Sequence, residues 1–322
     1  MLANAEIAFP VKGLAVPATR KNDCWVTSLA TLLGPVARQE IRREMTGPPA
    51  CAAQVLSHMI EGLARLMHLD DAVYAGHDLL TTSLYDDAGQ LTTTKRHPGK
   101  ATIVRSLNRH HHADLLDGAT TLWPIRVVWL IDDPARDWLP RRDVRRDRRS
   151  LADSGLARGR YTALTAPQLD RVLALYRGLY ISRYSRYNPD YTPDYVAAML
   201  ADGRLEIHTL EHEAEIVAFC AIHCKANILS VPMLGYNDRL PYSDALYRML
   251  MVLPVETAMA RGFSVNLSAG AARFKRHRGA KPHVEYLMIL DDHLPAWRRF
   301  GYRAIGRLLR ILEPQLMEVA TQ

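Results

Sequence analysis

The clearest chemical pattern lies between a predicted strand and a predicted helix, at residues 237–245. The strand 228–236 ends in a polar loop, and a helix begins at Asp244. A strand followed by a loop and a helix start is a general cradle for anions, because the first backbone N–H groups of a helix have no partner within it. The sequence therefore predicts a phosphate or pyrophosphate site at this loop.

Cys24 offers a different chemistry. It precedes Trp25 at a predicted helix start, where a lowered thiol pKa would make it nucleophilic. Catalysis would then need a base, which His77 or one of His110–His112 would supply. The pair resembles the cysteine helix of transglutaminase-like and papain-like enzymes, although the preceding residues, Lys21–Asp23, depart from the G-x-C-W pattern. The alternative is a cysteine packed in a core.

Two further groups have metal-binding residue types without the spacing of a metal site. Cys220 and Cys224 lie on one face of an apolar strand with His223 beside them, and no second ligand pair follows at zinc spacing. We expect core cysteines there. His110–His112 lie near a helix start, where a solvated cap is expected and metal binding would be weak. The sequence therefore predicts no metal cofactor.

The composition excludes several classes of protein. Of 322 residues, 48% are hydrophobic and 23% charged, which is typical of a globular protein rather than a disordered or fibrous one. Four cysteines are too few for a disulfide scaffold. The net charge of +7 permits an anionic partner without requiring one. No apolar run approaches the ~20 residues of a membrane span. The N-terminus lacks a basic start, so we expect a cytoplasmic protein without membrane contact.

The first half of the chain mixes helices and strands. A dense charged run, Arg141–Arg149, follows it. The run indicates a solvated helix or linker with ion pairs one turn apart; the alternative is a basic patch for phosphates or nucleic acid. Helices are expected at about 23–33, 36–45, 51–67 and 110–117, and strands at 71–76, 79–85, 101–106 and 125–131.

The second half has a clearer order: two helices, three strands joined by short turns, a long helix, a strand, a helix, a strand and a helical tail. The three strands predict an antiparallel meander. Pro254 is expected to kink the long helix. The expected bounds are 167–180, 192–202, 204–210, 216–224, 228–236, 244–260, 263–267, 271–278, 283–290 and 294–318.

This order, together with the stretch Asn266–Ala280, resembles the GNAT superfamily, the Gcn5-related N-acyltransferases. The stretch is similar to the segment of a strand, small residues and F/Y-K-x-x-F-G found in the branch of Fem-type peptidyltransferases. Leu179–Pro189 resembles the first helix and following loop of that branch. The resemblance covers about residues 160–292. It implies an α+β (mixed α/β) fold, the GNAT acyl-CoA N-acyltransferase fold, with a mixed, mostly antiparallel sheet flanked by helices.

Fem-type proteins carry two tandem GNAT-like units, and the length fits two domains of roughly 150 residues each. The resemblance therefore implies four segments of the chain. We expect a degenerate GNAT-like N-terminal domain over 1–131, a basic linker over 132–160, a GNAT catalytic domain over 161–292 and C-terminal helices over 293–322.

The resemblance also implies a catalytic centre in the second unit. Lys275 matches a lysine in the active centre of Fem-type enzymes, where a cation can bind a phosphate or stabilise a tetrahedral intermediate; without the motif, a solvated lysine is expected. The other residues implied for catalysis are Tyr236, Asn266 and Ser268. The donor is expected to contact Leu234, Gly235, Arg239, Tyr242, Ser243, Asp244 and Ala245, and the acceptor Tyr184, Tyr187, Asn188 and Asp238.

Three features depart from the GNAT pattern. Of the pyrophosphate signature Q/R-x-x-G-x-G/A, the stretch Arg239–Ala245 keeps only the first arginine and the final small residue. Arg278 stands where an aromatic residue is expected. The strand 228–236 carries no carboxylate, although many GNAT enzymes place a base there.

The activity implied is transfer of an acyl group from a thioester, acyl-CoA first of all, to the amine of a small metabolite or amino acid. An acyl carrier protein could carry the donor instead. One alternative is a Fem-type aminoacyl-tRNA-dependent transferase, in which Arg141–Arg149 would contact RNA. Another is a non-catalytic GNAT-like binding module, which the altered pyrophosphate loop would fit.

Overall fold

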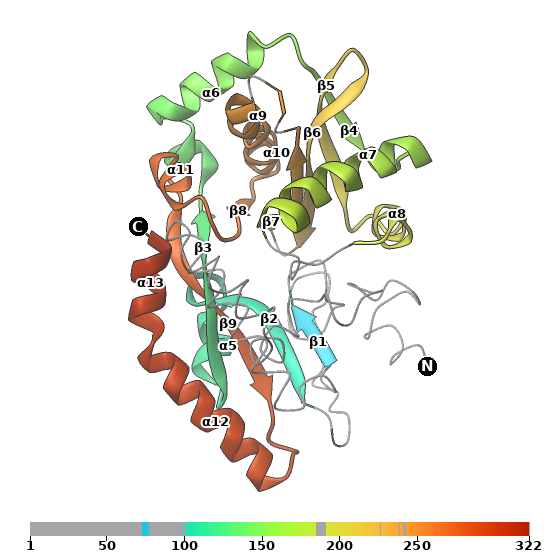
Figure 1. Ribbon diagram of the computed structural model, residues 1–322. Coiled ribbons are helices and arrows are strands. Elements are labelled where there is room, and N and C mark those ends of the chain that lie inside the picture. Colours follow the sequence, from blue (N-terminus) through green and yellow to red (C-terminus); the bar gives the residue numbers. More distant parts are fainter. Residues whose placement is uncertain are drawn as a thin grey trace.

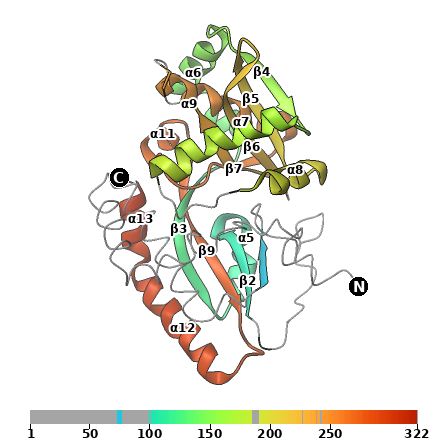
Figure 2. The same ribbon diagram turned by 45° about the vertical axis from the view of Figure 1, so that its right-hand side comes forward.

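The computed structural model of the chain describes residues 73–76, 99, 101–184, 191–225, 227–237, 239–240 and 243–321. The strands of this part form one nine-stranded sheet in the order β1-β2-β9-β3-β8-β7-β6-β5-β4 (Figures 1 and 2). The β1–β2 and β7–β8 pairs are parallel, and the other pairs are antiparallel. The predicted fold, a mixed and mostly antiparallel sheet flanked by helices, is confirmed.

The elements follow the predicted order closely. The strands are β1 Val73–Gly76, β2 Thr102–Asn108, β3 Leu122–Ile131, β4 Ala157–Tyr161, β5 Glu206–His212, β6 Glu215–Lys225, β7 Ile228–Tyr236, β8 Ser264–Asn266 and β9 Lys281–Leu290. The helices are α5 Arg109–Asp117, η3 Pro134–Trp138, α6 Arg142–Ala152, α7 Ala166–Tyr176, η4 Arg177–Tyr184, α8 Pro193–Ala201, α9 Ser243–Leu250, α10 Val252–Arg261, α11 Ala272–His277, α12 Ala296–Ile311 and α13 Glu313–Thr321. The elements predicted before residue 71, and at 79–85, lie outside the described residues.

The strand β8 joins the two parts of the sheet. It pairs antiparallel with the end of β3, where Leu130 faces Asn266, and parallel with the start of β7, where Ile228 faces Ser264. The β7–β8 pairing stops at Ser230, while β7 continues beside β6 to its end. The sheet therefore opens between β7 and β8.

The strand β9 comes from the C-terminal part of the chain but lies between β2 and β3. The edge strand β4 comes from the segment predicted as a linker and pairs with β5. Strands from both halves of the chain thus share one sheet, and the segment 132–160 carries a strand of it. The division into tandem units stays a prediction.

Alternate residues of β6 build two cores on the two faces of the sheet. Cys220 and Ile222 pack with α9 and α10, whereas Phe219 and Ala221 pack with α7 and α8. This follows from the two-residue period of a strand, which sends successive side chains to opposite faces. In Figure 1, α7 crosses one face of these strands and α9 and α10 lie on the other.

The prediction of one helix kinked at Pro254 is wrong. The chain forms two helices that meet at Met251, and Pro254 lies in the first turn of the second, α10. A proline fits there because the first N–H groups of a helix have no partner within it. Among the described residues, no helix is both long and apolar enough to cross a bilayer.

Gly235 in β7 lets α7 approach the sheet. A Cβ here would lie 2.6 Å from the carbonyl carbon of Leu175 and 2.7 Å from the backbone nitrogen of Tyr176. Backbone atoms cannot swing aside, so alanine would push α7 outward. We expect Gly235→Ala to lower the free energy of unfolding by about 2 kcal/mol, measured by urea denaturation. Gly178→Ala is the control, because its Cβ would meet nothing within 4 Å; similar losses in both variants would contradict this reading.

Candidate active site

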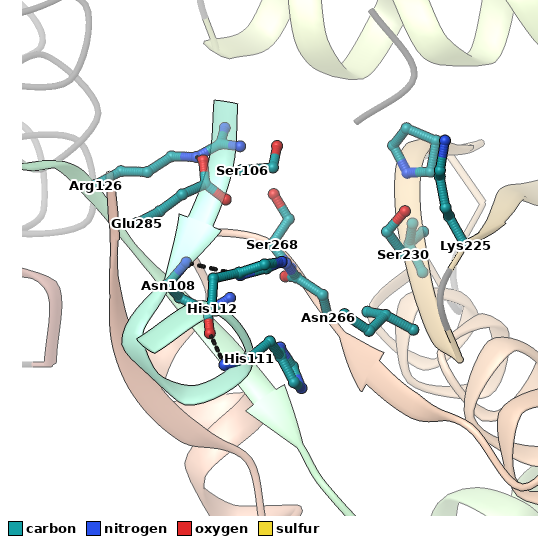
Figure 3. A pocket seen from close by; sticks show the side chains of 13 residues that line it. Ser106, Asn108, His111, His112, Arg126, Lys225, Ser230, Asn266, Ser268 and Glu285 are labelled. Carbon is teal, nitrogen blue, oxygen red and sulfur yellow. Dashed lines mark hydrogen bonds and ion pairs between the residues drawn. The ribbon is translucent and has the colours of Figure 1, made fainter. Parts of the chain in front are cut away.

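A polar pocket lies where the sheet opens between β7 and β8 (Figure 3). Residues from both parts of the sheet, and from α5 beside it, line the pocket. The polar ones are Ser106, Asn108, His111, His112, Arg126, Lys225, Ser230, Asn266, Ser268 and Glu285; the apolar ones are Ile228, Val231 and Pro232. The pocket is therefore suited to a polar ligand that reaches the edge of β7.

Irregular backbone directs several of these side chains. The pairing of β2 with β9 is interrupted around Ser106, and the pairing of β3 with β9 shifts just before Arg126. Such bulges redirect side chains and are frequent beside active sites. Ser106 and Ser268 also have positive φ angles, 60° and 61°. Strained conformations of non-glycine residues collect at functional sites.

An ion pair between β3 and β9 forms one wall. Arg126 Nε donates to Glu285 Oε1 over 2.7 Å, and the Glu285 side chain is 2% exposed. Neither residue is among the candidates that the sequence indicates. The available signal was a single charge in each of two otherwise apolar strands, predicted at 125–131 and 283–290. A buried charge in such a strand needs a partner, which the neighbouring strand supplies here.

His112 forms the α5 side of the pocket. Asn108 Oδ1 accepts the backbone N–H of His111 (3.0 Å), and the Asn108 backbone N–H donates to His112 Nδ1 (3.3 Å). Burial lowers the pKa of His112 to about 4. The imidazole is therefore neutral at pH 7, and the hydrogen bond to Nδ1 assigns its proton to Nε2.

The dihedral angles of His112 depart from helical values, and Figure 3 shows its ring pointing toward Ser268 and Asn266. The expected solvated cap is thus wrong for His112. Asn108, one residue before α5, is the cap instead.

Lys275 is buried and holds the loop after β8. Its Nζ donates to the carbonyl oxygens of Leu267 (2.7 Å), Ser268 (3.0 Å) and Ala269 (2.7 Å). These bonds use all three protons of the ammonium group. Burial and the nearby charge of Arg126 lower the pKa of Lys275 to about 7. Lys275 therefore shapes the pocket through Ser268 and is not itself among the lining residues. The solvated lysine expected without the family motif is wrong.

Two of the other predicted catalytic residues meet in the pocket. Asn266 and Ser268 both line it, and Asn266 Oδ1 accepts the Ser268 backbone N–H over 2.8 Å. Tyr236 lies at the far end of β7, where its ring packs 6.1 Å from that of Tyr247. The structure thus places Asn266 and Ser268 in one pocket and leaves Tyr236 outside its lining.

Residues 140–276 match the family model described as "Acetyltransferase (GNAT) domain". The predicted GNAT domain is thus confirmed over this segment, about two fifths of the chain. The protein is an acyltransferase. The matched segment begins just before α6 and ends within α11, so it contains both β7 and β8, between which the pocket opens.

Solved structures similar to this chain are distant in sequence. L-PGS from Bacillus licheniformis is 15% identical, with 74% of this chain and 84% of that chain covered and a TM-score of 0.49. A C-terminal domain from Agrobacterium fabrum, attributed to a lysylphosphatidylglycerol synthetase, is 14% identical over 66% and 72%, with a TM-score of 0.45. FemX is 9% identical over 64% and 74%, with a TM-score of 0.47. No curated protein matches the chain.

The donor residues implied by the GNAT pattern lie at the end of β7 and the start of α9. Leu234 is buried, Gly235 faces α7, and Ala245 is half-buried in α9. Arg239 is exposed, and its backbone N–H donates to Asn237 Oδ1 over 3.1 Å. Outside the described residues lie Asp238, Tyr242, Tyr187, Asn188, Cys24 and His77, and the side chains of Tyr184, Ser243 and Asp244.

Arg278, which stands in place of the family's aromatic residue, has a structural partner. Its Nε donates to Asp147 Oδ2 over 2.6 Å, and its guanidinium lies 3.6 Å from the ring centroid of Phe274. Asp147 belongs to α6, the helix predicted from the charged run, and is buried with Val144 and Leu151. The helix is confirmed, but one of its acids faces the protein interior rather than solvent.

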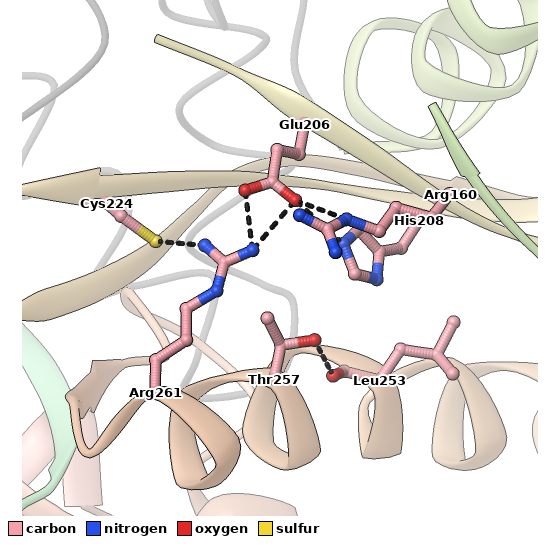
Figure 4. A network of polar contacts seen from close by, with 7 residues as sticks. All are labelled: Arg160, Glu206, His208, Cys224, Leu253, Thr257 and Arg261. Carbon is pink, nitrogen blue, oxygen red and sulfur yellow. Dashed lines mark hydrogen bonds and ion pairs between the residues drawn. The ribbon is translucent and has the colours of Figure 1, made fainter. Parts of the chain in front are cut away.

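A second polar cluster lies between the sheet and α10, away from the pocket (Figure 4). Glu206 accepts from Arg261 Nη2 at 2.7 and 2.9 Å and from Arg160 Nε at 2.8 Å. Arg261 also donates to Cys224 Sγ over 3.2 Å. Cys220 is fully buried, as expected for a core cysteine. This cluster fastens α10 to β4, β5 and β6.

The pH dependence of stability tests this cluster. Burial opposes ionisation of Glu206, but the guanidinium groups of Arg261 and Arg160 outweigh it and hold the pKa of Glu206 below its usual value. The contribution to stability is then present above the ordinary glutamate pKa of 4.5 and lost as the pH falls through the folded-state pKa. We expect the urea midpoint of Glu206→Gln to fall less than that of the parent as the pH is lowered. Glu213→Gln, at an exposed position, is the control and should keep the pH dependence of the parent. If Glu206→Gln also kept the pH dependence of the parent, the assignment would be refuted.

Proposed function

We propose that the pocket between β7 and β8 is the active site of an N-acyltransferase that moves an acyl group from a thioester, acyl-CoA first of all, to the amine of a small metabolite or amino acid. The observation that carries this proposal is the end of the β7–β8 pairing at Ser230 inside the GNAT domain. Past Ser230, β7 no longer pairs with β8. Backbone N–H and C=O groups on this edge of β7 are then available to the amides and the thioester carbonyl of the donor.

The polar wall of the pocket suits an amine acceptor. The carboxylate of Glu285 attracts an ammonium group and orients it with the help of Ser106 and Asn108. The amine attacks as the neutral form, so it gives its proton to solvent before the new C–N bond forms. As the C–S bond breaks, the leaving thiolate takes up a proton from solvent. Neutral His112 donates from Nε2 and is suited to the oxygen that becomes negative in the tetrahedral intermediate. Asn266 and Ser268 complete this wall.

The phosphates of the donor would lie at the start of α9. This helix follows β7 after a short loop, and its first N–H groups favour an anion. Arg239 is exposed in that loop and adds positive charge. In this proposal the residues from Tyr242 to Ala245 also contact the donor, while Tyr184, Tyr187, Asn188 and Asp238 lie on the acceptor side.

Thermal stabilisation by CoA, acetyl-CoA and longer acyl-CoAs tests the donor. A ligand at ~100 times its dissociation constant adds about 2.7 kcal/mol of stability. Ser230→Trp fills the opening between the strands and should abolish the shift, whereas the exposed Ser182→Trp should keep it. A shift that survives Ser230→Trp would place the donor elsewhere, and no shift with any CoA would exclude acyl-CoA. Product formation with a panel of amines then ranks the acceptors.

A second candidate is an aminoacyl-tRNA-dependent transferase. It is favoured by α6, where Arg142, Arg145 and Arg149 are exposed together. Arginines that neutralise phosphates release counterions, so binding of bulk tRNA should weaken steeply with salt. Loss of this binding in a triple alanine variant would support the RNA reading. Binding of neither CoA nor tRNA would favour a donor on a carrier protein or a non-catalytic module.

A further inference from the structure

Three metal-ligating side chains meet where α5 approaches the end of β3. His110 and His111 follow the N-cap of α5, and Asp132 comes directly after β3. His110 Nε2 lies 2.7 Å from Asp132 Oδ1. One ligand atom from each of the three residues lies within 4.8 Å of the others. The cluster adjoins the pocket, because His111 also lines it.

We propose that His110, His111 and Asp132 bind a divalent transition-metal ion of the Zn²⁺ class. Two imidazole nitrogens and one carboxylate oxygen are ligands that Zn²⁺ accepts, and three protein ligands leave a position for water. The sequence predicted no metal because Asp132 is distant from the histidines along the chain. Folding of α5 against the strands removes that separation.

An unsatisfied ring nitrogen of His111 favours a metal. His111 Nδ1 is buried and has no hydrogen-bond partner, while Nε2 lies 3.4 Å from Ser264 Oγ. Buried polar atoms of this kind are normally satisfied. A bound metal would satisfy this one.

Two neighbours bear on the site. The His283 ring on β9 lies 5.1 Å from that of His110, and its Nε2 is likewise buried without a hydrogen-bond partner. It is placed to accept from a metal-bound water, as outer partners of metal sites do. Lys281 Nζ lies 3.9 Å from Asp132 Oδ2, and its side chain is 61% exposed. A metal can therefore displace this ammonium into solvent.

Metal titration of the untagged 322-residue chain, first stripped with a chelator, tests the proposal. Zn²⁺ is followed by calorimetry and Co²⁺ by its visible absorption. We expect one ion per chain and a Co²⁺ spectrum typical of nitrogen and oxygen ligands. His110→Ala and Asp132→Asn should each weaken binding by about 10-fold or more, since losing even an outer partner of a ligand costs that much. The exposed His212→Ala should bind like the parent.

Two results would overturn the proposal: no binding by the parent chain, or binding that both site variants retain. Asp132→Asn keeps the shape of the side chain, and circular dichroism without metal checks that each variant is folded. The readout is metal affinity, so it is independent of acyl transfer. The acyl-CoA shift of the same variants, measured separately, keeps failure of the metal site distinct from failure of the proposed function.

Discussion

Replacing Lys275 with methionine is expected to lower the free energy of unfolding by about 3 kcal/mol, because it leaves buried carbonyl groups without donors at a cost of about 1–3 kcal/mol each. Methionine keeps much of the volume of the lysine stem, so the loss isolates the ammonium group. The three carbonyls belong to Leu267, Ser268 and Ala269, which form the loop that carries Ser268 into the pocket. Urea denaturation gives the stability.

The same variant should lose most of its turnover, because the loop after β8 would no longer hold Ser268 in place at the pocket. Arg273→Met, on an exposed position of the same helix, is the matched control and should keep both stability and turnover. A Lys275→Met protein as stable as the parent but with a much lower kcat would contradict the positioning role. It would show instead that Lys275 acts directly on the reacting groups.

The pH dependence separates the lysine from other contributions. The pKa of Lys275 falls from 10.5 to about 7 on folding, through burial first and Arg126 second. Between these values the unfolded chain binds the proton and the folded chain does not, so stability rises with pH over this window. Below it both states are protonated and the contribution is constant. Lys275→Met should lack the rise, and a rise of equal size in this variant would refute the shifted pKa.

Local patterns were sufficient to predict most of the second half of the fold. The meander β5-β6-β7 follows from strand-like segments joined by short turns, which place sequence neighbours side by side. The loop and helix after β7 also follow from a local pattern, because a polar loop there leads into a helix start. The end of the long helix was also correct, because Gly262 with its φ of 69° closes α10.

The position of β9 could not be predicted in this way. Its pairing with β2 and β3 joins segments more than a hundred residues apart, and no turn between them encodes it. The pocket depends on this pairing, because Glu285 reaches Arg126 only once β9 lies beside β3. The sequence therefore indicated Asn266 and Ser268, which belong to a local motif, and missed the ion pair, which does not.

Substituting Asp147 with asparagine is expected to lower the free energy of unfolding by about 3–5 kcal/mol, the usual cost of removing one partner of a buried ion pair. Asparagine keeps the shape of the side chain but not its charge. Arg278, whose side chain is 7% exposed, would then keep a buried positive charge without a counter-charge, beside the Phe274 ring and carbonyl. Urea denaturation measures the loss.

Asp143 is the matched control, since it lies one turn earlier on α6 with its side chain 26% exposed. Its contacts with Arg146 and His277 are at 3.4 and 3.5 Å. Asp143→Asn should therefore cost about 1 kcal/mol or less, as exposed pairs do. Equal losses at the two positions would show that the burial of Asp147 has no energetic consequence.

The double variant Asp147→Leu with Arg278→Phe tests why this chain departs from the family pattern at position 278. Replacing both members of a buried pair by apolar groups is often neutral or stabilising, and phenylalanine restores the aromatic residue that the pattern has there. We expect the double variant to recover most of the stability that Asp147→Asn loses. Such recovery would mean that the pair is one of two interchangeable ways to fix α6 to the end of α11, the helix that carries Lys275. A double variant as unstable as Asp147→Asn would mean that the arginine has a role that packing alone does not replace.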